Sequence, residues 1–202
     1  MIILIAAFEP DDHLVALISE LKLKCDYKIL IVDDGSGESY VSVFNRCKVL
    51  GCTVLEHDKN MGKGCALKTG FAYIKDNTDE RMGVVTADAD GQHLVKNILN
   101  VCLEIQNDDH NIVLGVRKFV GKIPWKSAIG NAFARRIFKL TSGSKLLDTQ
   151  TGLRGFSIES LPWLLSIDGE RYEYEMNMLL LAKKAGYVFK QIEIDKIVRA
   201  HV

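Results

Sequence analysis

The segment MGVVTADADGQH, residues 82–93, joins an apolar run to two carboxylates that stand two positions apart. Residues 82–87 have the length and composition of a strand that is buried on both faces. Asp88 and Asp90 follow at once, and because side chains alternate along an extended chain, both leave it on the same side. The segment therefore predicts a buried strand that ends in a pair of carboxylates.

Strand and helix patterns alternate on both sides of this segment. Short apolar runs predict strands over residues 2–8, 27–32, 52–55, 82–87 and 112–116. Apolar residues at helical spacing predict helices over residues 11–24, 38–50, 62–75 and 94–107. Such an order is typical of an α/β fold with a mostly parallel sheet flanked by helices. We expect a single domain over residues 1–202.

Composition excludes several classes of protein. The 202 residues carry 26 basic and 26 acidic side chains, so no global field draws the chain to nucleic acid or to a membrane. The five cysteines form no C-x-x-C pair, and an odd number without a framework suggests a reducing cytosol. The apolar start lacks a basic region, and no stretch approaches the roughly 18 apolar residues of a membrane span. These features predict a cytoplasmic protein.

Polar residues follow the predicted strands where those strands end. They are Glu9, Asp33, Asp34, Asp88, Asp90 and Arg117. In open parallel sheets, ligands bind outside the carboxyl ends of the strands. We therefore expect these side chains to surround one site.

The pair Asp88 and Asp90 has two interpretations. Two carboxylates aimed into a crevice repel each other unless a cation lies between them, and oxygen ligands favour Mg2+ or Mn2+. Gln92 adds a neutral oxygen at the same spacing, and such a metal would bridge a diphosphate. The alternative is a solvated turn, because Asp and Gly are common turn residues.

Two other loops are also open to two interpretations. Asp33 and Asp34 either form a strand-to-helix turn or bind the base and ribose of a nucleotide. Residues 60–64, NMGKG, either simply begin a helix or bind an anion through free N–H groups and Lys63. Neither this loop nor the end of the first strand has a common phosphate-binding fingerprint, which argues against NTPases and nicotinamide enzymes.

Basic residues gather in one stretch of the chain. Residues 117–147 contain no acidic side chain and eight basic ones, namely Arg117, Lys118, Lys122, Lys126, Arg135, Arg136, Lys139 and Lys145. Apolar residues recur among them at helical spacing. A basic amphipathic helix can lie on an anionic membrane, or its apolar stripe can pack on the sheet. Nucleic acid is disfavoured, because the aromatic side chains lie on the apolar stripe.

Five motifs in order resemble the family 2 glycosyltransferases over about residues 2–195. They are AFE at residues 7–9, LIVDDGS at 30–36, NMGKGCA at 60–66, TADADGQH at 86–93 and DTQTGLRGF at 148–156. The last two are similar to the polyprenyl-phosphate branch, which includes dolichyl-phosphate mannose synthases. The resemblance implies a GT-A fold, with a nucleotide-sugar half over about residues 1–116 and an acceptor half over about residues 117–202.

The resemblance also implies roles for single residues. Ala7, Glu9 and Asp33 would line the nucleotide pocket, with Asp34 and Lys63 beside them. Asp88, Asp90 and Gln92 would hold metal and diphosphate. Arg117 and an arginine of the pair Arg135 and Arg136 would face the acceptor phosphate. Ala6 departs from the proline that the family often has, and the membrane helices of many relatives are missing. Either the chain is part of a longer protein, or residues 117–145 meet the membrane peripherally.

The implied reaction transfers a hexose, with inversion, from a nucleotide-diphosphate sugar to a polyprenyl phosphate or a cell-envelope glycan precursor. A phosphate acceptor is already ionised, whereas a hydroxyl acceptor needs a carboxylate base. Asp148 is the first candidate base, followed by Glu173 and Glu175, which also suit the dipole of a helix start. Arg154 either binds phosphate or orients Asp148.

Two rival functions remain. A sugar-phosphate nucleotidyltransferase would want a Gly-rich, Arg-containing loop after the first strand, which this sequence lacks. A non-catalytic module that binds nucleotide-sugars without turnover is the second alternative.

Overall fold

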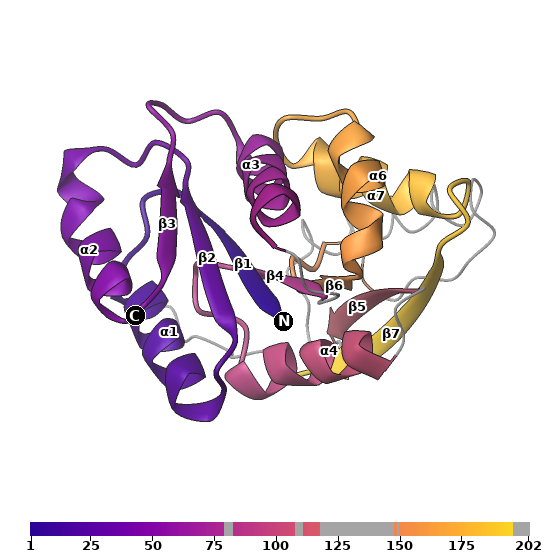
Figure 1. The fold of residues 1–202 in the computed structure, drawn as a ribbon, viewed down its shortest axis with the longest axis horizontal. Helices are drawn as coiled ribbons and strands as arrows, with labels where there is room; N and C mark the ends of the chain where they lie inside the picture. Colours follow the sequence, from indigo (N-terminus) through magenta and orange to yellow (C-terminus); the bar gives the residue numbers. More distant parts are fainter. Residues whose placement is uncertain (79–82, 108–110, 118–147, 149, 196–202) are drawn as a thin grey trace, which may run out of the picture.

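The computed structural model describes residues 1–78, 83–107, 111–117, 148 and 150–195 (Figure 1). The strands are β1 (Ile2–Ala7), β2 (Lys28–Asp33), β3 (Thr53–Glu56), β4 (Val84–Asp88), β5 (Asn111–Arg117), β6 (Arg154–Phe156) and β7 (Val188–Ile194). The α-helices are α1 (Asp12–Lys24), α2 (Val41–Val49), α3 (Lys63–Asn77), α4 (Val95–Asn107), α6 (Leu161–Ser166) and α7 (Glu173–Ala182). Short 3-10 turns, η1 (Glu38–Tyr40) and η2 (Ile158–Ser160), lead into α2 and α6.

The described strands form one sheet in the order β3-β2-β1-β4-β6-β5-β7. Neighbouring strands are parallel except at β6, which is antiparallel to both β4 and β5. This arrangement confirms the predicted mostly parallel sheet. The five strands and four helices predicted up to residue 117 are all present, with ends that differ by at most three residues.

The strand order places one edge of the sheet under the predicted site. The chain proceeds from β1 to β2 and β3 in one direction, and β4 lies on the other side of β1. Such a reversal of strand order opens a crevice at the carboxyl ends of the strands. In the register of the sheet, Ala7 pairs with Asp33 and Ala6 pairs with Asp88. The carboxylates that follow β2 and β4 therefore flank the end of β1.

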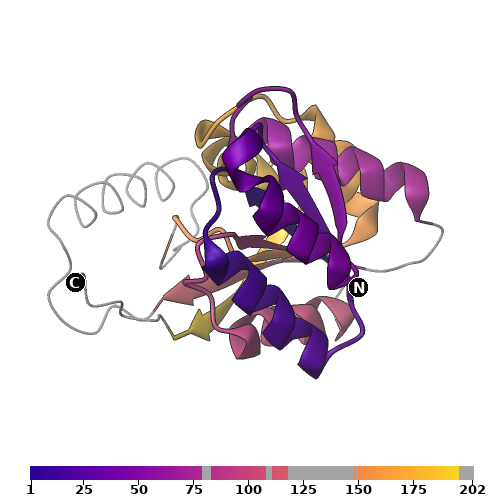
Figure 2. The ribbon, with the colours of Figure 1, turned by 90° about the vertical axis from the view of Figure 1, so that its left-hand side faces the viewer.

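Two hydrophobic cores cover the two faces of the sheet. Side chains alternate along β1, so that Ile3 and Ile5 pack with α1, α2 and α4, while Ile2 and Leu4 pack with α3, α6 and α7. Figures 1 and 2 show these two layers of helices on opposite sides of the sheet. The site lies where the layer of α3 and α7 meets the strand ends.

Within the described residues, no helix is long and apolar enough to cross a bilayer. The amphipathic helix expected within residues 117–145, with Arg135 and Arg136, falls outside the described residues apart from Arg117.

Candidate functional site

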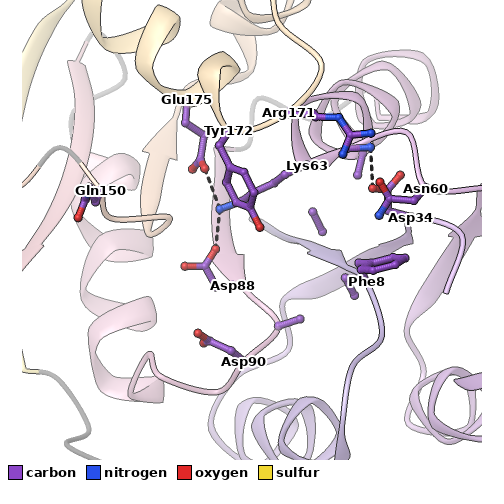
Figure 3. A pocket seen from close by; sticks show the side chains of 15 residues that line it. Phe8, Asp34, Asn60, Lys63, Asp88, Asp90, Gln150, Arg171, Tyr172 and Glu175 are labelled. Carbon is purple, nitrogen blue, oxygen red and sulfur yellow. Dashed lines mark hydrogen bonds and ion pairs between the residues drawn. The ribbon is translucent and has the colours of Figure 1, made fainter. Parts of the chain in front are cut away.

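A cavity of about 440 Å³ opens at the carboxyl ends of β1 and β4 (Figure 3). Its lining includes six residues that the sequence predicts for the site, namely Ala7, Asp34, Lys63, Asp88, Asp90 and Glu175. These side chains come from β1, β4, α3, α7 and the loops that follow β2 and β4, so the fold gathers residues that are up to 168 positions apart, from Ala7 to Glu175. Of the six polar residues expected to surround one site, Asp34, Asp88 and Asp90 line this cavity.

Lys63, the first residue of α3, bridges two carboxylates across this cavity. Its Nζ lies 2.7 Å from Oδ1 of Asp88 and 2.8 Å from Oε2 of Glu175. Burial by itself would lower the pKa of Lys63, but the charges and hydrogen bonds of Asp88 and Glu175 outweigh it and raise the pKa above its ordinary value. The ammonium group therefore stays charged at neutral pH.

Asp88 is held as an anion from several sides. Its second oxygen, Oδ2, lies 3.0 Å from Nε2 of His93. Burial would raise the pKa of Asp88, but the hydrogen bond to His93 and the charge of Lys63 hold it well below its usual range. The backbone of Gly152 lies so close that a Cβ there would come within 2.3 Å of Oδ1. The loop before β6 thus closes one side of the carboxylate.

Asp90 and Gln92 lie beside Asp88 on a tight turn. Asp90 is exposed, and its Oδ1 accepts a hydrogen bond of 2.9 Å from the backbone N–H of Gln92. A second, small cavity of about 30 Å³ is lined by Asp88, Asp90, Gln92, His93 and Arg117 among others. The turn predicted as the alternative for this segment is therefore present, and the two carboxylates still face cavities.

The donor set around Asp88 suits a divalent ion that substrate phosphates help to hold. Among the described residues, no three His, Cys, Asp or Glu side chains are grouped as a complete metal site. Mg2+ in proteins is typically bound by one or two carboxylates together with substrate phosphates, and does not need an all-protein cage. Asp88 and Asp90, which both line the main cavity, fit that pattern.

Asp34 occupies the anion position at the start of α3. Its two oxygens accept hydrogen bonds of 2.9 Å from Met61 N–H and 2.8 Å from Gly62 N–H, and its Oδ1 lies 2.8 Å from Nδ1 of His57. Farther into the helix, the N–H of Cys65 donates to the carbonyl of Glu170. The expectation that free N–H groups of this loop bind an external anion is wrong at Met61 and Gly62, because a protein carboxylate already takes them. At the start of α3, the side chain of Lys63 lines the cavity.

Asp33 and Glu9 belong to the turns beside the cavity. Oδ1 of Asp33 accepts hydrogen bonds of 2.9 and 2.6 Å from the backbone N–H and the hydroxyl of Ser36. Ser36 Oγ in turn accepts from the N–H of Glu9, which adopts a positive φ of 49°. Neither Asp33 nor Glu9 is among the residues that line the main cavity. Asp33 therefore stabilises the turn after β2, which was one of its two interpretations. Asp34 is the carboxylate of the pair that lines the cavity.

The three candidate bases have different surroundings. Asp148 is fully buried and receives hydrogen bonds of 2.5 Å from Nε and 3.0 Å from Nη2 of Arg117. Glu173 is exposed, and its Oε1 accepts from the backbone N–H groups of Glu170 and Arg171, which lowers its pKa. Of these three carboxylates, Glu175 is the one that lines the main cavity. Glu173 therefore fits the interpretation of an acidic residue at the start of a helix. Asp148 orients the side chain of Arg117.

Arg154 ties β6 to α7. It is 1% exposed, and it donates through Nε to the carbonyl of Thr151 and through Nη1 to the carbonyl of Glu175. Its Nη2 also lies 3.8 Å from Oε1 of Glu175. The expectation that Arg154 orients Asp148 is wrong, because Arg117 makes that contact and Arg154 holds Glu175. Arg154 also lines a further cavity of about 390 Å³ together with Gln150, Tyr172, Glu175 and Met176.

Several cavity residues are missing from the sequence-based prediction. Phe8 and Tyr172 are exposed aromatic side chains at the cavity, and Arg171 points toward Asn60 and Asp34 in Figure 3. Phe8 and Tyr172 each stand next to a predicted residue in the sequence, and Arg171 stands two positions before Glu173, but an exposed aromatic or arginine has no spacing pattern of its own. His93, which the sequence does not mark as a site residue, contacts Asp88 directly.

Comparison with known proteins agrees with this geometry. The family model described as glycosyl transferase family 2 matches residues 2–161. A UDP-N-acetylglucosamine–dolichyl-phosphate N-acetylglucosaminyltransferase of Methanococcus voltae is 29% identical over 214 residues, which cover 96% of this chain and 84% of the relative. A dolichyl-phosphate beta-glucosyltransferase of Dictyostelium discoideum is 26% identical over 191 residues, which cover 88% of this chain and 57% of the relative.

Solved structures show the same fold. Glucosyl-3-phosphoglycerate synthase from Mycobacterium tuberculosis, in complex with Mn2+, UDP and phosphoglyceric acid, superimposes with a TM-score of 0.72 at 15% identity, over 100% of this chain and 71% of that one. The expected GT-A fold is thereby confirmed. The match of the family model over most of the chain, on a fold that these structures share, shows that the protein belongs to glycosyl transferase family 2.

Proposed function

We propose that this glycosyltransferase moves a hexose from a nucleotide-diphosphate sugar to the phosphate of a polyprenyl-type lipid, with inversion at the anomeric carbon. The observation that carries the proposal is the cavity at the strand ends, where Asp88, Asp90, Lys63 and Glu175 converge beside the end of β1. A family 2 enzyme must bind the diphosphate of the donor and the sugar–phosphate bond that breaks. The proposal assigns both to this one cavity.

The donor diphosphate would lie between Lys63 and the pair Asp88 and Asp90. Lys63 is a charged donor on the cavity wall, and an ammonium group at this position stabilises the charge that develops on the leaving diphosphate. Structures of the same fold hold Mn2+ or Mg2+ with UDP, which supports the use of a divalent ion. Such an ion, held by Asp88 and Asp90 with Gln92 nearby, would supply Lewis-acid stabilisation of the diphosphate.

A phosphate acceptor is favoured by the surroundings of the candidate bases. A sugar hydroxyl would need a free carboxylate within hydrogen-bond reach to take its proton. Asp148 is buried against Arg117, Glu173 accepts hydrogen bonds from the backbone of Glu170 and Arg171, and Glu175 is paired with Lys63. A phosphate monoester is largely ionised at neutral pH and requires no base. The relatives named as dolichyl-phosphate glycosyltransferases support the same acceptor class.

In this reaction an acceptor phosphate oxygen forms a bond with the anomeric carbon, while the bond from that carbon to the diphosphate oxygen breaks. The protein binds and aligns the two substrates, and Lys63 stabilises the departing anion. Arg117 is held by Asp148 and lines the small cavity together with Asp90, and in the proposed reaction it would attract the acceptor phosphate.

The proposal is tested by substitution of the exposed member of the acidic pair. We expect Asp90→Ala to weaken Mn2+-dependent binding of UDP-, GDP- or dTDP-sugar, whichever the wild type binds in calorimetry, by at least about tenfold, since a metal ligand is lost. Glu173→Gln, which removes a carboxylate outside the cavities, is the matched control. Unchanged binding and unchanged dependence on Mn2+ in Asp90→Ala would contradict the metal site.

The rival reaction is separated by its products. Incubation with a nucleotide-sugar and a polyprenyl phosphate should release nucleoside diphosphate. Release of pyrophosphate from an NTP and a sugar phosphate would instead identify a nucleotidyltransferase, and absence of either product with intact nucleotide-sugar binding would favour a binding module.

The lipid acceptor also implies contact with a membrane surface. We propose that the basic stretch of residues 117–145 provides it, because each Lys or Arg near an anionic surface adds about 1 kcal/mol of attraction. Wild type should sediment with vesicles that contain anionic lipid, and the double substitution Arg135→Glu, Arg136→Glu should abolish sedimentation. Equal sedimentation of the two proteins, or none for the wild type, would overturn this part of the proposal.

A further inference from the structure

Three charged side chains form a row across the main cavity, with one cation between two anions. Lys63 Nζ lies 2.7 Å from Asp88 and 2.8 Å from Glu175 (Figure 3). All three side chains are largely shielded, with exposed fractions of 20% for Lys63, 30% for Asp88 and 13% for Glu175. One ammonium group therefore has two carboxylate partners at nearly equal distance.

A divalent ion and the ammonium group of Lys63 would compete for the same oxygen of Asp88. In the proposed function Asp88 is a metal ligand. In the structure, however, Oδ1 of Asp88 accepts a hydrogen bond from Lys63, and Oδ2 lies against His93. A divalent ion at Oδ1 would repel the nearby ammonium group and weaken its contact with Asp88. A shielded ammonium group without an anionic partner is unfavourable in free energy. Binding of the ion would be weakened by this amount unless another anion pairs with the ammonium group.

Glu175 is fixed in place independently of Asp88. Its carbonyl accepts a hydrogen bond of 2.8 Å from Arg154 Nη1, and its Oε1 lies 3.8 Å from Arg154 Nη2. Arg154 is itself fully packed and anchored to the carbonyl of Thr151. The carboxylate of Glu175 therefore stays where it is whether or not Lys63 contacts Asp88.

We propose that Glu175 is a positioning residue that retains Lys63 when a divalent ion takes Asp88. It acts on the metal site through Lys63, and it is neither a metal ligand nor a base. This inference rests on the metal site of the proposed function. Its consequence is that Glu175 controls the affinity for the ion only while Lys63 is present.

The test is a double-mutant cycle read out by Mn2+ binding without nucleotide, measured from the electron paramagnetic resonance signal of the free ion. Glu175→Gln should weaken Mn2+ binding by about tenfold, because Lys63 then competes for Asp88 without an alternative partner. Lys63→Gln keeps a polar side chain in the cavity and removes the competing charge. In that background, Glu175→Gln should change the affinity by less than about twofold, because the coupling is lost.

Controls separate the possible failures. Glu173→Gln, on the same helix but outside the cavities, should leave Mn2+ binding unchanged, and thermal melting verifies that each variant is folded. An equal effect of Glu175→Gln in both backgrounds would show a direct charge or ligand role and overturn the inference. So would no effect in either background. If the wild type binds no Mn2+ without nucleotide, the inference fails, because no ion then competes with Lys63 for Asp88. If Asp90→Ala binds Mn2+ as well as the wild type does, the metal site of the proposed function itself fails.

Discussion

At the scale of the residue, Asp88 links the stability of the fold to pH. Its pKa is depressed in the folded protein, because the contacts with His93 and Lys63 outweigh the effect of burial. Above the ordinary aspartate pKa of about 3.9, the carboxylate is charged in both states and the folded state keeps its contacts. As the pH falls below that value, the unfolded chain takes up the proton first, so this contribution to stability is progressively lost.

We therefore expect Asp88→Asn to flatten the acid side of the stability profile. At neutral pH the variant should be less stable by about 1–3 kcal/mol, since Lys63 and His93 lose a charged partner. Between pH 5 and pH 3 the difference from the wild type should shrink, as measured by urea unfolding at each pH. A difference that stays constant over this range would contradict the assignment of the depressed pKa to Asp88.

Single residues also show how far the sequence predicts the site. Asp88 was predictable, because it ends a buried strand beside the end of β1. Asp90 lies on the turn that follows β4, so the alternation of an extended strand does not fix where its side chain points. The choice between Asp33 and Asp34 was not, since it depends on hydrogen bonds to Ser36 and Gly62 that local pattern does not encode. The burial of Asp148 likewise depends on Arg117, 31 positions away.

At the scale of the element, the two glycines of the NMGKG loop serve the contact between α3 and the start of α7. A Cβ at Gly62 would come within 2.6 Å of the carbonyl oxygen of Glu170, and Gly62 also has a φ of +101°. A Cβ at Gly64 would come within 2.7 Å of Tyr174 Cβ and 2.8 Å of the backbone of Glu170. These glycines allow α7 to approach closely enough for Glu175 to reach Lys63.

Gly64→Ala should therefore damage both stability and the site. Overpacking against backbone typically costs about 1–3 kcal/mol, which exceeds the gain in helix propensity from alanine of about 1 kcal/mol. We expect a lower midpoint in denaturant unfolding and a lower rate of sugar transfer, because the displaced α7 moves Glu175 away from Lys63.

Gly186→Ala provides the matched comparison for this effect. Gly186 has a φ of +89°, but nothing lies within 4 Å of a Cβ built there. Its substitution should cost stability through backbone strain alone and leave the transfer rate per folded molecule unchanged. If both variants lose activity equally, the close approach of α3 and α7 does not matter for the site.

The elements themselves were predictable to different degrees. The long apolar strands β1 and β2 and the amphipathic helices α1 and α4 follow from local periodicity. β6 has three residues, one of which is the buried Arg154, so no periodicity marks it. It exists because β4 and β5 each supply an edge for it, which is information from distant parts of the chain.

At the scale of the whole molecule, the two expected halves share one sheet. β6, from the half expected to bind the acceptor, lies between β4 and β5 of the half expected to bind the nucleotide-sugar. All seven residues of β5 pair with β7, which also belongs to the second half. Phe156 of β6 packs against Phe71 of α3 with ring centroids 5.9 Å apart. The boundary near residue 116 therefore separates two parts of the expected site. It does not separate two folding units, because one sheet and one core include residues from both halves.

This interleaving predicts that a fragment of residues 1–117 does not fold cooperatively. Without the second half, β4 and β5 have no strand between them, and α3 loses its packing against Phe156, Leu161, Tyr174 and Met178. Each large apolar side chain contributes about 1.5–3 kcal/mol when buried, so the loss of several approaches the total stability of about 5–15 kcal/mol typical of a domain. Thermal melting of the fragment, followed by far-ultraviolet circular dichroism, should show no sharp transition, whereas the full chain melts in one step. A cooperative transition in the fragment would instead show that the nucleotide-sugar half is an independent folding unit, and that β6 and β7 only add to a sheet that is already formed.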